Sequence, residues 1–146
     1  MPLPEFNEVG DLPEGNYHAT LDEVVLRFGS GSAQREAVTR RLERIYELAV
    51  ATGYLDRIVA FGSYVSAVEK PNDVDVILVM KNEFRLEECS AEAAILFDHA
   101  RANDELGASV FWIRPDLLLG QPLDEFLAFW RRKRDGRQRG IVEISP

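Results

Sequence analysis

The sequence predicts an α/β (α+β) domain in which a mixed β-sheet is flanked by helices. Short apolar runs typical of buried strands alternate with stretches whose apolar residues recur every three or four positions, as in amphipathic helices. The 146 residues are enough for one domain with a buried core and too few for two. We expect this domain to cover residues 18–146, after an extended N-terminal lead-in over residues 1–17.

The first half of the chain contains the lead-in and two predicted helices. Three of the seven prolines and two glycines fall in residues 1–17, and these residues favour extended or turning backbone. The run Thr20-Leu21-Asp22-Glu23 fits a capping box and opens a short helix that Gly29 closes. The clearest helix runs from Ala33 to Thr52 and ends before Gly53, because its apolar residues alternate at spacings of three and four.

Four apolar runs are predicted as strands, and they cover residues 57–61, 74–80, 108–113 and 140–144. Between the second and third strands we expect a helix from Ala91 to about Arg101, with Ser90 as its N-cap. A last helix is predicted from Asp124 to Lys133. The dipeptide Asp135-Gly136 then indicates a tight turn before the closing strand.

Composition restricts the cellular setting and the possible cofactors. No apolar run approaches the roughly 20 residues that span a bilayer, and the N-terminus lacks the pattern of a signal peptide. Cys89 is the one cysteine, so no internal disulfide is possible, and with only His18 and His99 in addition a Cys/His zinc site lacks ligands. We expect a soluble cytoplasmic protein that does not bind membranes.

Charge is unevenly distributed along the chain. Residues 1–130 hold 11 basic and 23 acidic groups, a net charge of −12, whereas residues 131–146 hold six and two, a net charge of +4. The acidic body repels a phosphate backbone, so nucleic acid is an unlikely partner. The C-terminal basic cluster either attracts an anion locally or is a solvated helix end that the helix dipole favours. It comprises Arg131, Arg132, Lys133, Arg134, Arg137 and Arg139.

The segment that indicates chemistry runs from Phe61 to Val76. Gly62 follows a predicted buried strand, where a residue without a Cβ lets backbone N–H groups approach a phosphate, and Ser63 adds a hydroxyl donor. Asp73 and Asp75 stand at positions i and i+2 of the next predicted strand, so their side chains leave the same face. Two carboxylates so close are costly unless they are neutralised, and Mg²⁺ or Mn²⁺ would neutralise them.

Each part of this segment also has a structural interpretation. A Gly-Ser pair after a strand is commonly only a turn, and an Asp-Val-Asp triplet can be a strand entry with one capping carboxylate. The combination of both, with a strand before Gly62 and a strand that carries both aspartates, is more specific than either part. Trp112, Trp130, Phe126 and Phe129 fall at spacings typical of a core, with an aromatic base-stacking surface as the alternative.

The run Gly62-Ser63 followed by Asp73-Val74-Asp75 resembles the signature of the nucleotidyltransferase-fold superfamily, in particular of its minimal single-domain members. The stretch Asp56 to Val79 is also similar to a little-characterised bacterial family of small nucleotidyltransferase-like proteins. Those proteins tend to end in a Lys/Arg-Gly-Ile-Val strand, which Arg139-Gly140-Ile141-Val142 matches. The resemblance extends over residues 12–28, 56–80 and 123–144.

The resemblance implies a nucleotidyltransferase-like domain that binds a nucleoside triphosphate with two divalent ions. By the match of motifs, Gly62 and Ser63 would bind the nucleotide, and Asp73 and Asp75 would be the catalytic residues and ligate Mg²⁺ or Mn²⁺. The implied reaction transfers a nucleoside monophosphate to an acceptor hydroxyl, on a small molecule or on a partner protein encoded nearby, and releases pyrophosphate. The resemblance implies that two metal ions, about 3.5–4 Å apart, assist this step.

One departure from the pattern supports an alternative function. Active members supply a third carboxylate from a later strand, and Ser109 stands at that position here. Asp104 and Glu105 are the nearest acids, in the predicted turn before the strand. The alternative is therefore a catalytically silent interaction protein of the same fold, one half of a two-gene module of the toxin–antitoxin type.

Overall fold

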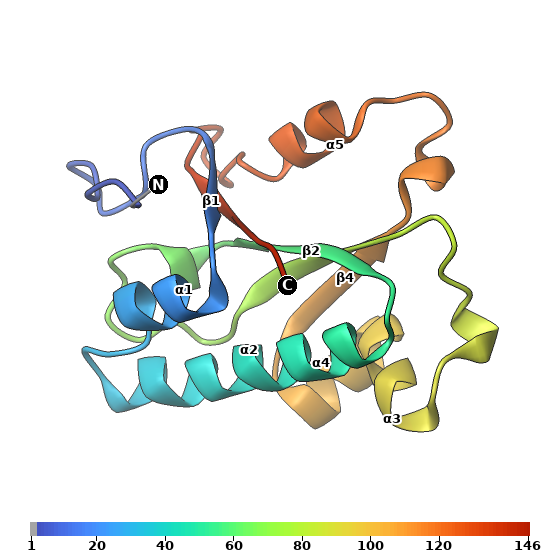
Figure 1. The fold of residues 1–146 in the computed structure, drawn as a ribbon. Coiled ribbons are helices and arrows are strands. Elements are labelled where there is room, and N and C mark those ends of the chain that lie inside the picture. The colour runs from blue at the N-terminus through green and yellow to red at the C-terminus, as the bar shows by residue number, and fades with distance from the viewer. Residues whose placement is uncertain (1–2) are drawn as a thin grey trace.

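A computed structural model describes residues 3–146, which build one five-stranded mixed sheet with helices on both faces (Figure 1). The strand order is β1-β5-β2-β3-β4, in which β1/β5 and β3/β4 are parallel and β2 is antiparallel to both of its neighbours. The predicted mixed sheet flanked by helices is confirmed. The strands are β1 (Asn16–Ala19), β2 (Leu55–Phe61), β3 (Asp75–Met80), β4 (Ser109–Ile113) and β5 (Ile141–Ile144).

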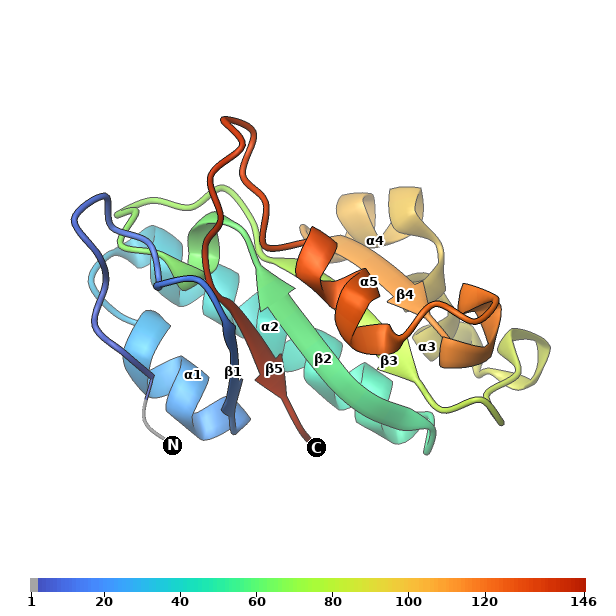
Figure 2. The same ribbon diagram turned by 90° about the horizontal axis from the view of Figure 1, so that it is seen from above.

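Four α-helices lie on one face of the sheet and the fifth lies on the other (Figures 1 and 2). The α-helices are α1 (Leu21–Phe28), α2 (Ala33–Ala51), α3 (Ala91–Ala94), α4 (His99–Leu106) and α5 (Leu123–Phe129). The 3₁₀ turns are η1 (Ser63–Val65), η2 (Leu86–Glu88), η3 (Ile95–Phe97) and η4 (Pro115–Leu118). Within residues 3–146 no helix has the length and apolar character that crossing a membrane requires.

The predicted helix starts in the first half of the chain are confirmed by their caps. The Thr20 hydroxyl accepts a hydrogen bond from the backbone N–H of Glu23, whose carboxylate accepts one from the backbone N–H of Thr20. Ser32 caps α2 in the same way, through the backbone N–H of Arg35. Gly53 follows α2 with a φ of 79°, a left-handed conformation that favours glycine.

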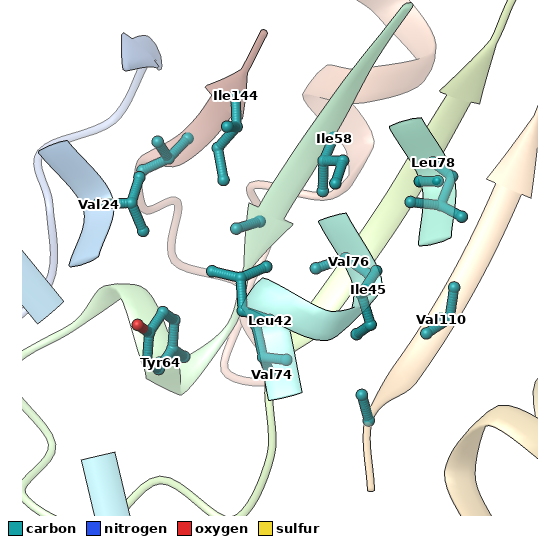
Figure 3. Close-up of a cluster of buried hydrophobic side chains, with 14 of the residues drawn as sticks. Val24, Leu42, Ile45, Ile58, Tyr64, Val74, Val76, Leu78, Val110 and Ile144 are labelled. Atoms are coloured by element: carbon teal, nitrogen blue, oxygen red, sulfur yellow. The ribbon is translucent and has the colours of Figure 1, made fainter. Parts of the chain in front are cut away.

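The core has two parts because the sheet is covered on both faces. The larger part lies between the sheet and the helices of the first face, where Leu42 and Ile45 of α2 pack against β2, β3 and β5 (Figure 3). The smaller part lies under α5 and joins Leu127 to Val59 and Ile77. Since alternate residues of β3 enter the two parts, its sequence is a continuous apolar run.

The expected lead-in and the helix expected after Ser90 both differ from the observed structure. The last residues of the expected lead-in form the start of β1, which pairs in parallel with β5 at one edge of the sheet. The helix expected over residues 91–101 is broken into α3, η3 and α4. The break occurs because the 3₁₀ turn buries Leu96 and packs Phe97 against Phe84, after which the Asp98 carboxylate caps a new helix.

The C-terminal basic segment is not a helix end. Helix α5 stops at Phe129, and residues 130–139 form a hairpin whose arms meet at an isolated bridge between Arg132 and Gln138. The turn at Asp135-Gly136 is confirmed, with Gly136 at a φ of 87° and its N–H bonded to the carbonyl of Lys133. In Figure 2 this hairpin projects past the end of β2.

Candidate active site

A cavity of about 780 Å³ opens where the ends of β2, β3 and β4 face the hairpin over residues 130–139. The strand register sets this end of the sheet, because Phe61, Asp75 and Ser109 are cross-strand partners in one row. We call the side of the cavity formed by Gly62, Ser63, Asp75 and Ser109 the acidic wall. We call the opposite side the basic wall, and its residues are Arg132, Lys133, Arg134 and Arg139.

Gly62 allows the backbone of β2 to pass directly against the carboxylate of Asp75. Its φ of 84° is a left-handed conformation that side chains strongly disfavour. A Cβ at this position would also overlap Oδ2 of Asp75 and lie 3.2 Å from its Cγ. The glycine predicted as a nucleotide-binding residue is therefore required for the close approach of the turn to the predicted metal ligand.

The two aspartates and Ser109 form one cluster. Asp73 lies two residues before β3 rather than within it, so the expectation of two aspartates in one strand is wrong for Asp73. Their proximity holds nevertheless, since the Ser109 hydroxyl donates a hydrogen bond of 3.3 Å to Oδ2 of Asp73. Ser109, the first residue of β4, lines the cavity.

Burial raises the pKa of Asp75 to about 6, and the nearby charge of Asp73 adds to the rise. The Ser109 hydroxyl and the charge of Arg139 act in the opposite direction. The ionised form of Asp75 is thus incompletely compensated by the protein itself. A bound cation would supply the missing positive charge.

The oxygen donors of Asp73 and Asp75 are of the kind that suits Mg²⁺ or Mn²⁺. Mg²⁺ is usually held by one or two carboxylates together with waters and the phosphates of its substrate, and Asp73 and Asp75 supply two carboxylates. Within residues 3–146 no group of three or more His, Cys, Asp or Glu side chains is arranged to hold a metal. Asp104 and Glu105 do not line the cavity, because they lie on α4 rather than in a turn and Glu105 pairs with Arg101.

The basic wall is positioned by Asp11, a buried residue of the N-terminal segment that the sequence did not mark. Its carboxylate accepts a hydrogen bond of 2.6 Å from Nζ of Lys133 and one of 3.2 Å from Nη1 of Arg139. Asp11 also forms an isolated bridge with Ser66, three residues after Ser63. The N-terminal segment therefore joins the basic wall to the segment that carries the acidic wall.

Arg35 fixes the chain that follows the Gly62-Ser63 turn. Its guanidinium is 6% exposed and donates hydrogen bonds to four backbone carbonyls, those of Phe28, Tyr64, Ser66 and Val68. Tyr64 is fully buried and meets the Thr39 hydroxyl at 2.6 Å. The residue after Gly-Ser is therefore a core residue here and does not line the cavity.

Aromatic side chains form the remaining surface of the cavity. They come from β2, β4 and the end of α5, and they are Phe61, Phe111, Phe129 and Trp130, with His99 beside them. Phe129 is 65% exposed, so its predicted place in the core is wrong; Leu127 is the buried residue of α5. Trp112 and Phe126 do pack against the core as predicted.

Residues 4–145 match a family described as a family of unknown function, DUF6932. The chain belongs to this family. Comparisons with curated proteins and with solved structures found no match.

The DUF6932 match covers nearly the whole chain, so it includes Asp11, both walls of the cavity and the aromatic surface. The family description assigns no activity. The function of this member must therefore be inferred from the chemistry of the cavity.

Proposed function

We propose that this chain is a nucleotidyltransferase-like protein whose cavity binds a nucleoside triphosphate with one divalent cation. It would transfer the nucleoside monophosphate to a hydroxyl acceptor. The observation that carries the proposal is the pairing of opposite charges across one cavity. Asp75 lines the cavity against the Gly62 turn, and Asp73 is hydrogen-bonded to the neighbouring Ser109. Four cationic side chains of the hairpin line the same cavity, and two of them, Lys133 and Arg139, are paired with Asp11. A triphosphate is negatively charged and complements the basic wall, and its metal ion is positively charged and complements the aspartates.

The roles of the residues follow from their chemistry. Asp73 and Asp75 would hold Mg²⁺ or Mn²⁺, whose contribution when bound is to neutralise charge on the triphosphate. Ser63 offers a hydroxyl to a phosphate oxygen, and the guanidinium groups of the basic wall suit phosphate oxygens in bidentate fashion. Asp75 would be ionised in this state, because a cation favours the charged form of a neighbouring carboxylate.

The reaction in this proposal is a substitution at the α-phosphorus. The oxygen of the acceptor hydroxyl forms a bond to the α-phosphorus while the bond from that phosphorus to the bridging oxygen of the β-phosphate breaks. Pyrophosphate leaves with the electron pair of the broken bond, and the hydroxyl proton passes to solvent or to a carboxylate. Ser109 is a poor proton acceptor compared with an aspartate, so we expect transfer to be slow.

A transfer assay tests the proposal. The protein is incubated with α-³²P-labelled ATP, GTP, CTP or UTP, Mn²⁺ and a cell extract as the source of hydroxyl acceptors. We expect slow incorporation of label that Asp75→Asn abolishes and that Ser109→Asp increases, because a third carboxylate completes the cation site. Rapid incorporation that Asp75→Asn leaves unchanged would contradict the proposal.

The second candidate is a catalytically silent protein that binds the same ligand and acts through a protein partner. The absence of a three-carboxylate group from residues 3–146 favours it. It predicts that the metal–triphosphate complex binds but that neither the wild type nor Ser109→Asp incorporates label. Binding measured by calorimetry beside the transfer assay therefore separates the two candidates.

A further inference from the structure

The aromatic side chains of the cavity form one connected cluster. The ring of Trp130 lies 5.0 Å from that of Phe61 and 5.2 Å from that of Phe111, measured between centroids. Phe129 meets Trp130 edge-on at 6.1 Å, and the ring of His99 lies 4.8 Å from that of Phe111. The distances and tilts are those at which aromatic rings attract one another, so the cluster is a preformed surface.

Two members of this cluster are exposed although they are large and apolar. Phe129 is 65% exposed and Phe111 is 36% exposed, and both line the cavity. Trp130 and Phe61 are partly buried against the core beneath α5 and support them. A pocket that combines apolar rings with a few convergent charged groups is typical of a small-molecule site, and its volume lies in the usual range of about 300–1,000 Å³.

The charges beside the rings determine which kind of ligand fits. The guanidinium of Arg132 lies over the ring of Phe129, 5.9 Å from its centroid, so a cationic group already stands on one face of the exposed ring. Lys133 and Arg134 continue the basic wall, and Asp75 faces it from the sheet. A ligand that fills the cavity must therefore carry a flat ring system at one end and a dense negative charge at the other.

We infer that the aromatic cluster is the subsite for the nucleotide base, with the exposed ring of Phe129 as its main contact. This inference rests on the proposed function, since it assigns the ring-binding part of the same ligand. Stacking on an aromatic face accepts all four bases, because each base has a π-face. The cluster thus makes a nucleoside triphosphate bind more tightly than inorganic polyphosphate, whereas the charged walls bind both.

A comparison of four nucleoside triphosphates with inorganic tripolyphosphate, on the wild type and three variants, tests the inference. Calorimetry measures the dissociation constants of ATP, GTP, CTP and UTP, and of inorganic tripolyphosphate, each with Mg²⁺, for the wild type, Phe129→Ala and Phe129→Trp. Leu26→Ala is the control, because Leu26 is an apolar residue of α1 that is 85% exposed and does not line the cavity. Phe129 is exposed, so its truncation leaves the core intact.

We expect the best nucleotide to bind the wild type at least about fivefold more tightly than tripolyphosphate, the lower end of base–aromatic stacking. Phe129→Ala should remove most of this difference while tripolyphosphate binding changes less than about twofold, and Phe129→Trp should restore it. Leu26→Ala should leave both constants unchanged.

Three results would overturn the inference. Equal weakening of nucleotide and tripolyphosphate by Phe129→Ala would show that Phe129 acts on the charged end. Nucleotide binding that Phe129→Ala leaves unchanged would place the base elsewhere, even though the proposed function stands. Failure of the wild type to bind either ligand would overturn the proposed function together with the inference.

Discussion

The two walls of the cavity are built in different ways. The acidic wall lies at the ends of β2, β3 and β4, and the chain after its glycine turn is held by the buried guanidinium of Arg35. The basic wall is a hairpin outside the sheet, and Asp11 fixes it through ion pairs with Lys133 and Arg139. Each wall thus depends on one buried residue whose charge is opposite to that of the wall. The cation Arg35 supports the acidic wall, and the anion Asp11 supports the basic wall.

The difference shows where the fold provides rigidity. The row formed by Phe61, Asp75 and Ser109 is fixed by backbone hydrogen bonds of three neighbouring strands. The hairpin is held from outside by side chains and not by a strand ladder: Asp11 pairs with Lys133 and Arg139, and Arg131 contacts Glu14 and Asn16. The side chains of Lys133 and Arg139 are each 22% exposed. We therefore expect the acidic wall to open only with global unfolding and the basic wall to open locally, at a lower free energy.

The largest effect is expected from Arg35→Ala. This change removes the donor to three buried carbonyls and to that of the more exposed Val68, so we expect a loss of about 3–4 kcal/mol in the free energy of unfolding. Urea denaturation provides the measurement, and Arg40→Ala, at an exposed position of the same helix, is the control. A loss for Arg35→Ala no greater than that of the control would show that the segment after Gly62 needs no support from α2.

Gly62→Ala and Gly53→Ala form a matched pair. Both glycines have a left-handed φ, 84° and 79°, but a Cβ at Gly53 meets nothing within 4 Å whereas one at Gly62 meets Asp75. Gly53→Ala should therefore cost only the backbone strain, about 1–2 kcal/mol. Gly62→Ala should cost about 1–3 kcal/mol more, from overpacking against the carboxylate and from a ψ of −161°, which places Gly62 in a region that only glycine ordinarily occupies. Equal losses in urea denaturation would mean that Asp75 moves aside freely and that its position is not fixed by the turn.

Asp11→Asn tests the support of the basic wall. Replacing the buried carboxylate by an amide weakens both ion pairs, but the two cations can turn to solvent, so we expect a loss of about 1–2 kcal/mol in the free energy of unfolding. Hydrogen exchange should speed up in residues 131–139 and stay unchanged in β2 and β3. The control is Asp135→Asn, at the exposed tip of the hairpin. Faster exchange in β2 and β3 as well would show that the two walls are not independent.

A further effect is expected in the pH dependence of the metal-free protein. Because the folded pKa of Asp75, about 6, lies above its ordinary value of 3.8, the folded state favours the protonated carboxyl. The stability of the wild type minus that of Asp75→Asn should be greatest below about pH 4, fall up to about pH 6.5 and be constant above that. Thermal unfolding in the presence of a chelator gives both curves. A difference that grows with pH would mean that the ionised carboxylate is already compensated within the protein.

The acidic wall could be predicted from the sequence because its signals are local. Gly62 and Ser63 follow a strand, Asp73 and Asp75 accompany the next one, and Ser109 could be placed by the glycine before its strand. The strand register then brings these segments together with few alternatives, since a slip by one residue would expose the core face of a strand.

The basic wall and its supports could not be predicted in the same way. The charges of the hairpin are evident in the sequence, but they do not distinguish a hairpin from a helix end, because both structures can carry the same basic residues. Asp11 and Arg35 are ordinary charged residues whose burial depends on contacts with segments that are distant in the sequence. The alternation of Ser109 and Phe111 along one strand was the available signal for the aromatic surface.

The most direct test of the account is thermal unfolding with Mn²⁺ alone, with a nucleoside triphosphate alone and with both. We predict that both together raise the melting temperature of the wild type by more than the separate effects combined, by about 5–10 °C at a hundredfold excess over the dissociation constant. Asp73→Asn combined with Asp75→Asn should abolish this rise while leaving the free protein as stable or more stable. A rise of equal size in the wild type and the double variant would contradict the account, because the cation would then bind outside the acidic wall.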